Sequence, residues 1–462
     1  MYNDVKSCVK HHGSFSDCFS TSVGLMQGDA LSPVLFSLFV NDIELDLLNH
    51  CNNSYELKYL NLLLLMYADD TVIFSESIEG LQEMLNCLNI YCYKWNLCIN
   101  TDKTKVIIFC NGGIIRDNEK WYLGDNELEI VNEFNYLGLV LKFNGKFVET
   151  QKCIANQGRK ALFGLLRKFN DCNLNVETKL YLFDTYVSSI LSYSCEIWGY
   201  HSAIDIEKVH IDFCKRVLGV SKKCTNMMVF AELGRFPLNT SRKFRIIKYW
   251  LKILNTNNCI LKSCYELLLD DINLPRFNWA NAVKNILLEV GLPHIWDSQQ
   301  VENKTSFLFT VKQRLEDHFI QDCNRIINSS SKGFLYQHLN PTHSVKNYLK
   351  KRLEFVYSKL ITKIRLSEHS LFIEVGRRQN IQRENRLCTL CDNKTIEDEF
   401  HFILSCPFYH DLRINYIKKY FYVRPSVFKL IKLLNSENIK TLNNFGKYLY
   451  KAFLRREMFN KN

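Results

Sequence analysis

Short apolar runs alternate with turns in the first part of the chain. The segment Leu62–Phe74 consists of two such runs, separated by a turn that carries two adjacent carboxylates, Asp69 and Asp70. Each run is long enough for a buried strand and too short for most helices. We therefore predict a β-hairpin over about residues 57–75, with Ala68 to Asp70 at its tip.

Helical periodicity flanks this hairpin on both sides. After it, Ser77 is expected to cap an amphipathic helix whose apolar side chains recur at intervals of three and four residues, at Ile78, Leu81, Met84, Leu85, Leu88, Tyr91, Cys92 and Trp95. Before it, a helix is predicted with Ser32 as N-cap and Pro33 at the first helical position, ending near His50. Strands are expected at 105–109, 127–131 and 133–141, so the element order predicts an α+β fold.

From residue 147 onward the pattern is mainly helical, with one helix expected from Trp279 to Val290. The first of these helical segments is rich in cations. Five basic residues and no acid lie between 151 and 169, namely Lys152, Arg159, Lys160, Arg167 and Lys168. At helical spacing several of them share a face. Such a face predicts contact with a nucleic-acid backbone, and a solvated helix surface is the alternative.

The two carboxylates of the hairpin tip repel each other, so their placement calls for a reason. Oxygen ligands suit Mg²⁺, which typically takes one or two protein carboxylates together with substrate phosphates. Asp69 and Asp70 are therefore candidate magnesium ligands. An ordinary polar hairpin turn is the alternative.

The motifs taken together resemble those of one family. Gly24 to Phe36 (GLMQGDALSPVLF) followed by Tyr67 to Asp70 (YADD) closely resembles the palm of reverse transcriptases, in particular those of non-LTR (LINE-type) retrotransposons. Trp95 to Lys105, Tyr136 to Gly138, Cys195 to Gly199 and Glu232 to Pro237 also look like segments of such elements. The resemblance extends over nearly the whole chain and is specific as a set.

The resemblance implies a polymerase architecture without its fingers. We expect a partial palm at 1–145, a helical thumb at 146–255, a helical connector with a basic segment at 256–384, and a zinc-binding module with terminal helices at 385–462. Its implied partners are an RNA template, a DNA primer and deoxynucleoside triphosphates.

The resemblance also implies roles for individual residues. Asp69 is a direct metal ligand, and Asp70 is a ligand or its close support. The substrate-binding residues are Tyr67, Ala68, Gln27, Gly28 and Lys103, of which Lys103 lies near the pyrophosphate; a solvated lysine is the alternative there. The primer-grip hairpin is formed by Tyr136, Leu137 and Gly138.

Two departures from the family pattern bear on activity. The family's palm has a further metal-binding Asp on a strand before the Gly-Gln-Gly segment, and Asp4 and Asp17 lie in no matching context. The fingers would also lie upstream, so we expect a chain that begins within the palm. Met26 also stands where the family usually has an Arg, between the Gly and the Gln of this segment. Since two-metal catalysis depends on correctly held ions, we predict that this chain alone is inactive.

A second candidate metal site lies near the end of the chain. Cys388, Cys391, His401 and Cys406 form a C-x2-C-x9-H-x4-C pattern. Thiolates with one imidazole at this spacing close a tetrahedral, structural Zn²⁺ site, and Cys-His segments of this kind also occur in LINE-type reverse transcriptases. His410 is a less favoured substitute ligand. The alternative is a set of buried thiols beside a core histidine.

Composition narrows the class of protein. The 462 residues are 47% hydrophobic and 13% aromatic, as in a folded protein, and the net charge of +11 favours a polyanionic partner. Ten basic residues against four acids between 345 and 384 suggest a second nucleic-acid surface. No signal peptide or membrane span is evident. The 18 cysteines are mostly single, which predicts reduced thiols in the cytosol or nucleus and not a secreted protein.

Three functional interpretations remain open at this point. The first is an RNA-directed DNA polymerase fragment of a non-LTR retrotransposon. The second is a non-catalytic, zinc-containing RNA- or DNA-binding protein derived from such an element. The third is a fragment that folds poorly, because half a palm leaves a sheet edge and apolar surface uncovered.

Overall fold

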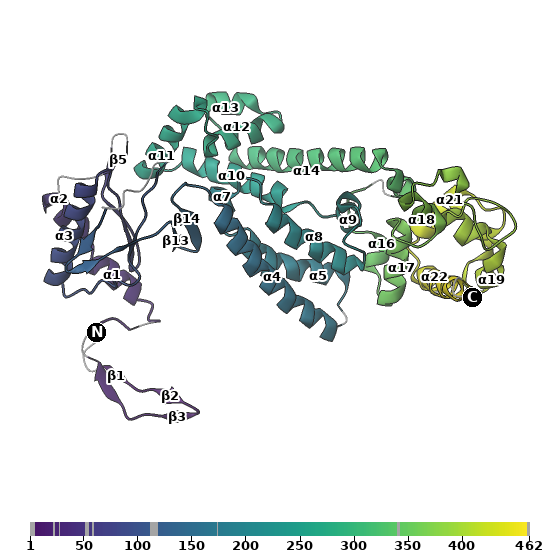
Figure 1. The fold of residues 1–462 in the computed structure, drawn as a ribbon, viewed down its shortest axis with the longest axis horizontal. Coiled ribbons are helices and arrows are strands. Elements are labelled where there is room, and N and C mark those ends of the chain that lie inside the picture. The colour runs from purple at the N-terminus through teal and green to yellow at the C-terminus, as the bar shows by residue number, and fades with distance from the viewer. Residues whose placement is uncertain are drawn as a thin grey trace. The chain divides into compact units, whose positions relative to one another are not determined.

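The computed structural model describes residues 5–21, 24–26, 28–50, 55–57, 60–110, 119–172, 174–339 and 342–459. It divides into two compact units (Figure 1). Unit 1 comprises residues 1–146 and 257–267, and unit 2 comprises residues 147–256 and 268–462. Each unit is described by itself. No helix in the described ranges has the length and apolar character needed to cross a bilayer.

Unit 1 combines three complete helices with pairs of short strands. The helices are α1 (Ser32–Phe39), α2 (Ile43–His50) and α3 (Ile78–Lys94). The strands are β1 (Val5–Ser7), β2 (Lys10–His11), β3 (Ser14–Phe15), β4 (Phe19–Thr21), β5 (Tyr55–Leu57), β6 (Leu60–Leu62), β7 (Leu64–Tyr67), β8 (Asp70–Ile73), β9 (Lys105–Val106), β10 (Tyr122–Leu123), β11 (Asn126–Glu127), β12 (Glu129–Ile130), β13 (Glu133–Tyr136) and β14 (Leu139–Lys142).

The described strands pair two by two. Six pairs are antiparallel (β1 with β4, β2 with β3, β5 with β6, β7 with β8, β10 with β11, β13 with β14), and β9 with β12 is parallel. The predicted α+β character is therefore present. The strand predicted at 105–109 is shorter than expected, since only Lys105 and Val106 pair, with Glu129 and Ile130.

The core of unit 1 lies between the β7–β8 hairpin and helices α2 and α3. Buried Leu63 and Leu64 pack with Leu47 from α2 and with Met84 and Tyr91 from α3. Helix α3 begins as predicted, because the Ser77 hydroxyl accepts a hydrogen bond from the Gly80 N–H. This packing supports the hairpin from one face and leaves its tip exposed.

The predicted helix from Ser32 to His50 is two helices. Ser32 is the first helical residue and Leu31 the N-cap position, so the predicted Ser32 cap is wrong; the Ser32 hydroxyl donates to the Met26 carbonyl instead (2.7 Å). The helix stops after Phe39, and Asp42 in the break accepts a 2.6 Å hydrogen bond from the Tyr91 hydroxyl of α3. This tertiary hydrogen bond holds Asp42 in the break between α1 and α2, whereas the hydrophobic periodicity alone predicts a continuous helix there.

Unit 2 is helical throughout its described residues, apart from isolated bridges at Leu233–Val345 and Leu387–Ile396. Its longer helices are α4 (Val148–Asp171), α5 (Val176–Phe183), α8 (Ile204–Leu218), α9 (Asn226–Leu233), α10 (Leu238–Leu254), α12 (Trp279–Glu289), α14 (Lys304–Ser329), α17 (Phe355–Arg365), α21 (Val427–Leu434) and α22 (Ile439–Phe459). Helix α11 (Cys259–Asp270) is divided between the units. The helix predicted from Trp279 is confirmed.

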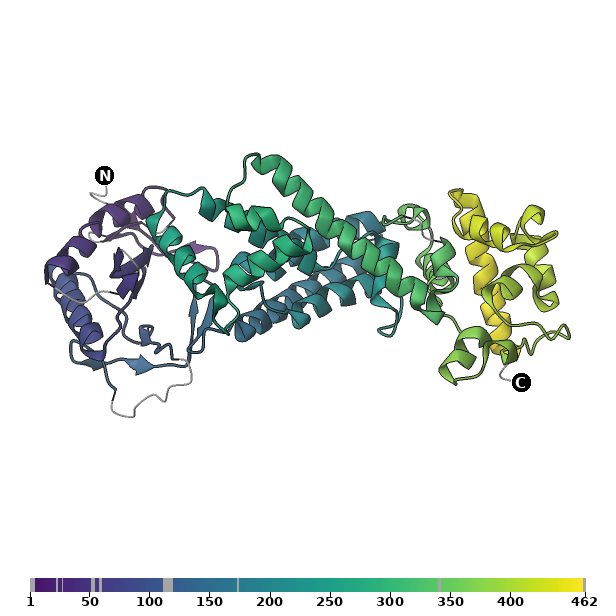
Figure 2. The same cartoon turned by 90° about the horizontal axis from the view of Figure 1, so that it is seen from above.

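Shorter helices connect these elements. They are η1 (Asp184–Ser188), α6 (Ser189–Leu191), α7 (Cys195–Trp198), η2 (Asp271–Asn273), α13 (Pro293–Ser298), η3 (Ser331–Gly333), α15 (Tyr336–Leu339), α16 (Asn347–Lys350), α18 (Phe372–Arg378), η4 (Arg383–Asn385), η5 (His401–Ser405), η6 (Pro407–Tyr409), α19 (His410–Tyr416) and α20 (Lys419–Tyr422). Within unit 2, α4 packs along α8, α10 along α14, and α22 along α17 and α19 (Figures 1 and 2).

Candidate functional site

The two adjacent carboxylates lie at the tip of the β7–β8 hairpin. Tyr67 pairs with Asp70, so Ala68 and Asp69 form a two-residue turn. Ala68 has a φ of 56°, the positive φ at the first central position that type II′ hairpin turns use. Both carboxylates and the Tyr67 ring are exposed, whereas Leu63 and Leu64 behind them are buried. A buried apolar base thus presents two carboxylates to solvent.

A second two-residue hairpin acts on the first one electrostatically. Tyr136 pairs with Leu139, and the turn residues Leu137 and Gly138 have φ values of 47° and 79°. Partial burial raises the pKa of Tyr136, and the negative charge of Asp70 raises it further. The predicted primer-grip tyrosine and a predicted metal-ligating carboxylate therefore lie within electrostatic range of each other in unit 1.

The glycine-rich segment before α1 forms an exposed loop. Gly24 and Gly28 have φ values of 93° and 91°, which explains glycine at both positions. The Asp29 N–H donates to the Met26 carbonyl, and the Asp29 carboxylate accepts from the Leu31 N–H. Gln27 lies outside the described residues, as does Asp4.

Lys103 lies in the turn that follows α3. Its backbone N–H donates to the Asn100 carbonyl (3.2 Å) and to the Asn100 side-chain oxygen (3.1 Å), and its side chain is exposed. Asp17 is exposed in the loop between β3 and β4. Within the described part of the chain, neither residue forms a metal-binding group with Asp69 and Asp70.

The predicted cysteine–histidine set is gathered in unit 2. Cys388 and Cys406 are buried, His401 is 5% exposed, and Cys391 is half-buried. One potential ligand atom from each of the four residues lies within 4.8 Å of all the others. His410 is exposed at the start of α19 and is not a member of this cluster.

Local hydrogen bonds explain how the four ligands meet. The Cys388 N–H donates to the Thr395 carbonyl (2.8 Å), which closes a knuckle around Cys388 and Cys391. His401 opens the one-turn helix η5, where its N–H donates to the Asp398 carboxylate, and Cys406 follows that turn with its N–H bonded to the His401 carbonyl.

The cluster is ready to accept an ion. His401 Nε2 lies 3.4 Å from Cys391 Sγ, while Nδ1 lies 3.0 Å from the Thr395 hydroxyl, a partner that leaves Nε2 to face the thiols. A hydrogen bond from the Cys406 thiol lowers the pKa of Cys388. The donor set and the pre-oriented imidazole fit a tetrahedral soft-metal site.

The zinc-ligand candidates are supported from outside by α19 and α22. Arg413 donates to the carbonyls of Ile403 and Cys406 (both 2.8 Å), and the Tyr448 hydroxyl donates to the Phe402 carbonyl (2.6 Å). Buried Arg456 pairs with Glu397. These bonds tie the backbone of the cluster to the terminal helices.

The basic face predicted on α4 is partly neutralised. Lys152 pairs with Glu149 (2.9 Å), and Arg159 lies 3.9 Å from Asp205. Lys160, Arg167 and Lys168 are exposed. Their helix also presents Phe163, 52% exposed, with the Arg216 guanidinium 5.7 Å from its ring. A smaller mixed basic and aromatic surface remains.

The basic segment at 345–384 is not a uniform surface. Arg365 is 1% exposed and pairs with fully buried Glu232 (2.6 Å), Lys346 is buried, and Arg377 pairs with Glu374. Lys350, Lys351, Arg352 and Arg378 are exposed, so the second nucleic-acid surface stays a prediction that Lys346 and Arg365, which are buried, cannot contribute to.

Two segments recognised by resemblance are packing motifs. Glu232 accepts from Arg365 and from the Tyr336 hydroxyl (2.8 Å). A Cβ at Gly234 would lie 2.7 Å from the backbone of Ser344. Trp198 is fully buried and donates to the Tyr193 carbonyl. Glu232 and Trp198 thus hold elements of unit 2 together, whereas Gly234 and the residues that follow it line a cleft.

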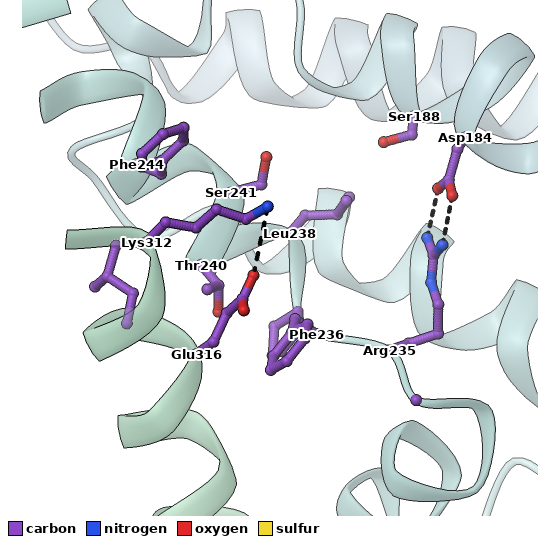
Figure 3. Close-up of a pocket in the computed structure, with 13 residues that line it drawn as sticks. Asp184, Ser188, Arg235, Phe236, Leu238, Thr240, Ser241, Phe244, Lys312 and Glu316 are labelled. Carbon is purple, nitrogen blue, oxygen red and sulfur yellow. Dashed lines mark hydrogen bonds and ion pairs between the residues drawn. The ribbon is translucent and has the colours of Figure 1, made fainter. Parts of the chain in front are cut away.

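A cleft of about 410 Å³ lies between η1, α10 and α14 (Figure 3). Its charged side chains pair with one another: both terminal nitrogens of Arg235 donate to Asp184 (2.6 Å each), and Lys312 lies 3.9 Å from Glu316. The π-helical turn η1 is the element that carries Asp184. The charged side chains of the cleft thus occur as two ion pairs.

Comparison with known proteins adds independent information. Residues 4–141 match the family described as reverse transcriptase (RNA-dependent DNA polymerase). The chain is 26% identical over 226 residues to an RNA-directed DNA polymerase from the mobile element jockey of Drosophila funebris, a match that covers 47% of the chain and 24% of that protein.

Two further relatives give a similar result. A match to an RNA-directed DNA polymerase from the transposon BS of Drosophila melanogaster is 26% identical over 220 residues and covers 45% of the chain and 23% of that protein. A transposon-derived protein of Caenorhabditis elegans is 27% identical over 168 residues, with 35% of the chain and 58% of that protein covered. The chain thus spans about a quarter of the length of the first two relatives.

Proposed function

We propose that this chain contributes the carboxylate hairpin of an enzyme that copies RNA into DNA. Its residues 4–141 match the reverse transcriptase family, and the chain is related to the RNA-directed DNA polymerases of non-LTR retrotransposons. The observation that carries the proposal is the exposed Asp69–Asp70 pair on a buried hairpin base, with the charge of Asp70 acting on Tyr136. The substrates are an RNA template, a DNA primer and deoxynucleoside triphosphates.

The divalent metal of this family fits the hairpin tip. Asp69 and Asp70 would hold Mg²⁺, because exposed carboxylate oxygens on a rigid support are the donors this ion takes. When bound, the metal supplies activation of the primer 3′ hydroxyl and neutralisation of triphosphate charge. The chain's own part is to fix the two carboxylates: Leu63 and Leu64 anchor the hairpin in the core.

Neighbouring residues are assigned to the substrates. We place Tyr67 and Ala68 beside the nucleotide and primer end, and Gln27 and Gly28 in the nucleotide and template pocket. Gly28 lies in an open loop, where an added Cβ would have no atom within 4 Å, so its φ of 91° is what favours glycine there and space for a substrate is left beside it. Lys103 is exposed and free to swing toward a pyrophosphate.

The hairpin of Tyr136, Leu137 and Gly138 is assigned to the primer end. Its support is the electrostatic link between Tyr136 and Asp70, which puts the tyrosine in the neighbourhood of the metal ligands. Helix α4, with Lys160, Arg167 and Phe163 exposed, is assigned to the template–primer backbone as part of a helical thumb.

We further propose that this chain by itself extends primers very poorly. Asp69 and Asp70 have no third carboxylate beside them in the described residues, and the family's second ion depends on one. Purified chain is assayed for primer extension on an RNA template with Mg²⁺. Robust extension that Asp69→Asn abolishes would refute the inactivity and support the polymerase assignment; extension that Asp69→Asn leaves intact would refute the role of the hairpin.

The cluster of Cys388, Cys391, His401 and Cys406 is proposed to bind Zn²⁺ as a structural ion. The four donors and the Thr395 partner of His401 support this assignment. Zinc would tie the knuckle to η5, and Arg413 and Tyr448 would transmit that order to α19 and α22. Zinc content of the folded protein near zero after metal-replete expression would refute it.

A second candidate function is nucleic-acid binding without catalysis. The observation that favours it is the exposed Phe163, flanked by Arg216 across from it and by Lys160 and Arg167 along α4. Such a surface binds phosphates and stacks on bases without any metal. Tight, salt-sensitive RNA binding combined with no extension, even when the chain is joined to a further polymerase segment, would favour this function.

A further inference from the structure

A groove near the C-terminus remains unexplained by the polymerase assignment. It has a volume of about 650 Å³ and lies among α20, α21 and the start of α22. Its lining includes the exposed side chains of Lys418, Tyr420 and Lys432, together with Asn435 and Glu437. The groove thus combines an aromatic ring with two cations in a hollow of the surface.

The tyrosine is held as a half-open platform. Tyr420 is 50% exposed, and the ammonium groups of Lys429 and Lys432 lie 5.0 and 5.1 Å from the centre of its ring. Lys429 is fixed in place because it donates to the carbonyls of Val423 (2.7 Å) and Arg424 (3.2 Å). The ring is therefore positioned by its neighbours while half of its surface stays available.

The cations that line the groove have no carboxylate partner among the described residues. Lys418 and Lys432 form no ion pair with a carboxylate of the described residues, unlike Arg455 and Arg456 of α22, which pair with Asp411 and Glu397. Glu437, the acid on the lining, accepts a hydrogen bond from Asn347 (2.8 Å). The floor is rigid, because Asn435 accepts from Arg365 and donates to the Leu339 carbonyl.

The positive charge continues beyond the groove. Lys419, Arg424, Lys440, Lys447 and Lys451 are exposed on the same helices and their connections. Lys451 also lies 5.3 Å from the ring of Tyr416 on α19, so the pairing of a lysine with a tyrosine recurs among the C-terminal helices. A polyanion with several negative charges would therefore meet further cations outside the groove.

We infer that this groove binds single-stranded nucleic acid, with a base stacked on Tyr420 and the adjoining phosphates on Lys418 and Lys432. Base stacking on an aromatic ring beside a basic track is the chemistry by which proteins hold single strands without sequence preference. A duplex keeps its base faces inside the stack, so the platform favours unpaired nucleotides. RNA and DNA strands share this chemistry. The inference is independent of polymerase activity, since the groove is remote in sequence from the carboxylate hairpin.

The test uses the full chain and fluorescein-labelled 15-mers of oligouridine and oligodeoxythymidine, with a duplex of the same length. Fluorescence anisotropy gives the Kd at several salt concentrations. Tyr420→Ala is expected to weaken single-strand binding about tenfold, whereas Tyr420→Phe, which keeps the ring, stays close to the unaltered chain. The control for folding is an unchanged zinc content and circular dichroism spectrum.

The role of charge is tested with a matched pair. Lys432→Glu and Lys304→Glu change the net charge equally, and Lys304 is exposed at the start of α14, outside the groove. Lys432→Glu is expected to weaken binding several-fold more than Lys304→Glu. It should also reduce the slope of log K against log salt by about 0.7 for each phosphate that the protein no longer neutralises.

A crosslink locates the binding site independently of other surfaces. A 4-thiouridine-containing 15-mer, irradiated with the chain and digested with trypsin, is expected to label the peptide Tyr420–Lys429. Preference for oligouridine or for oligodeoxythymidine would define the strand that the groove holds. The proposal is overturned if Tyr420→Ala and Lys432→Glu bind like the Lys304→Glu control, if the label falls elsewhere, or if the duplex competes equally. None of these results depends on primer extension, so the two proposals fail separately.

Discussion

Removing the negative charge of Glu232 is expected to destabilise unit 2 by about 3 to 5 kcal/mol, the cost of leaving one partner of a buried ion pair uncompensated. Glu232 is 0% and Arg365 1% exposed, and they meet at 2.6 Å. Glu232→Gln keeps the shape of the side chain but leaves the Arg365 guanidinium buried without a counter-charge. Burial lowers the pKa of Lys346 to about 8, and the negative charge of Glu232 opposes that shift. Glu232→Gln therefore also removes a charge that helps keep Lys346 protonated.

Urea unfolding is followed by tryptophan fluorescence, because four of the six tryptophans, including fully buried Trp198 and Trp250, lie in unit 2. With a slope of about 3 kcal/mol per M, the midpoint should fall by about 1 to 1.7 M. The control is Asp322→Asn, which breaks the exposed pair with Arg325 on α14 and should cost less than about 1 kcal/mol.

A double variant separates charge from packing. Glu232→Met combined with Arg365→Met removes both charges and should be clearly more stable than the sum of the two single changes. A Glu232→Gln midpoint as high as that of Asp322→Asn, or a double variant as unstable as the summed single changes, would refute the reasoning.

Three further predictions concern the metal cluster, one glycine and the thiols. Cys388→Ser should lower bound zinc from about one ion per chain to near zero by elemental analysis and lower the melting temperature, while Cys153→Ser on the surface of α4 should leave both unchanged. Gly234→Ala, whose Cβ would lie 2.7 Å from backbone, should destabilise the chain by more than about 2 kcal/mol, whereas Gly164→Ala, with no atom within 4 Å, should stabilise it by about 0.5 to 1 kcal/mol in urea titrations. Burial raises the pKa of Cys214 to about 12, so a smaller fraction of this thiol than usual is the reactive thiolate at pH 8. Alkylation of the folded protein should therefore label exposed Cys153 and spare Cys214. Equal labelling in a mass-spectrometric time course would contradict this.

Elements defined by local pattern could be predicted from the sequence. The hairpin around Ala68 and the helix after Ser77 follow from short apolar runs and from a cap that needs only neighbouring residues. The cysteine–histidine cluster was predictable because two local elements, a knuckle around Cys388 and Cys391 and one helical turn from His401, bring its four residues together. In each case the information lies within about twenty residues.

Features that depend on distant partners could not be predicted. The break after Phe39 follows from a bond between Asp42 and Tyr91, and the burial of Arg365 follows from Glu232, far away in the sequence. The groove around Tyr420 was missed for the same reason, although the excess of lysines over acids after residue 417 was a signal. A cluster of basic residues in the sequence therefore does not define a basic surface, because only the fold shows which of the cations are exposed.

Primer extension tests the central claim most directly. The chain is joined to the part of the jockey RNA-directed DNA polymerase that precedes the matched segment. The fusion is assayed on an RNA template with Mg²⁺, beside the same fusion carrying Asp69→Asn and the chain alone. The account predicts extension by the fusion, loss of at least a hundredfold with Asp69→Asn, and negligible extension by the chain alone. Equal extension by the fusion with and without Asp69→Asn would contradict the assignment of the Tyr67–Asp70 hairpin as the metal-binding part of a polymerase.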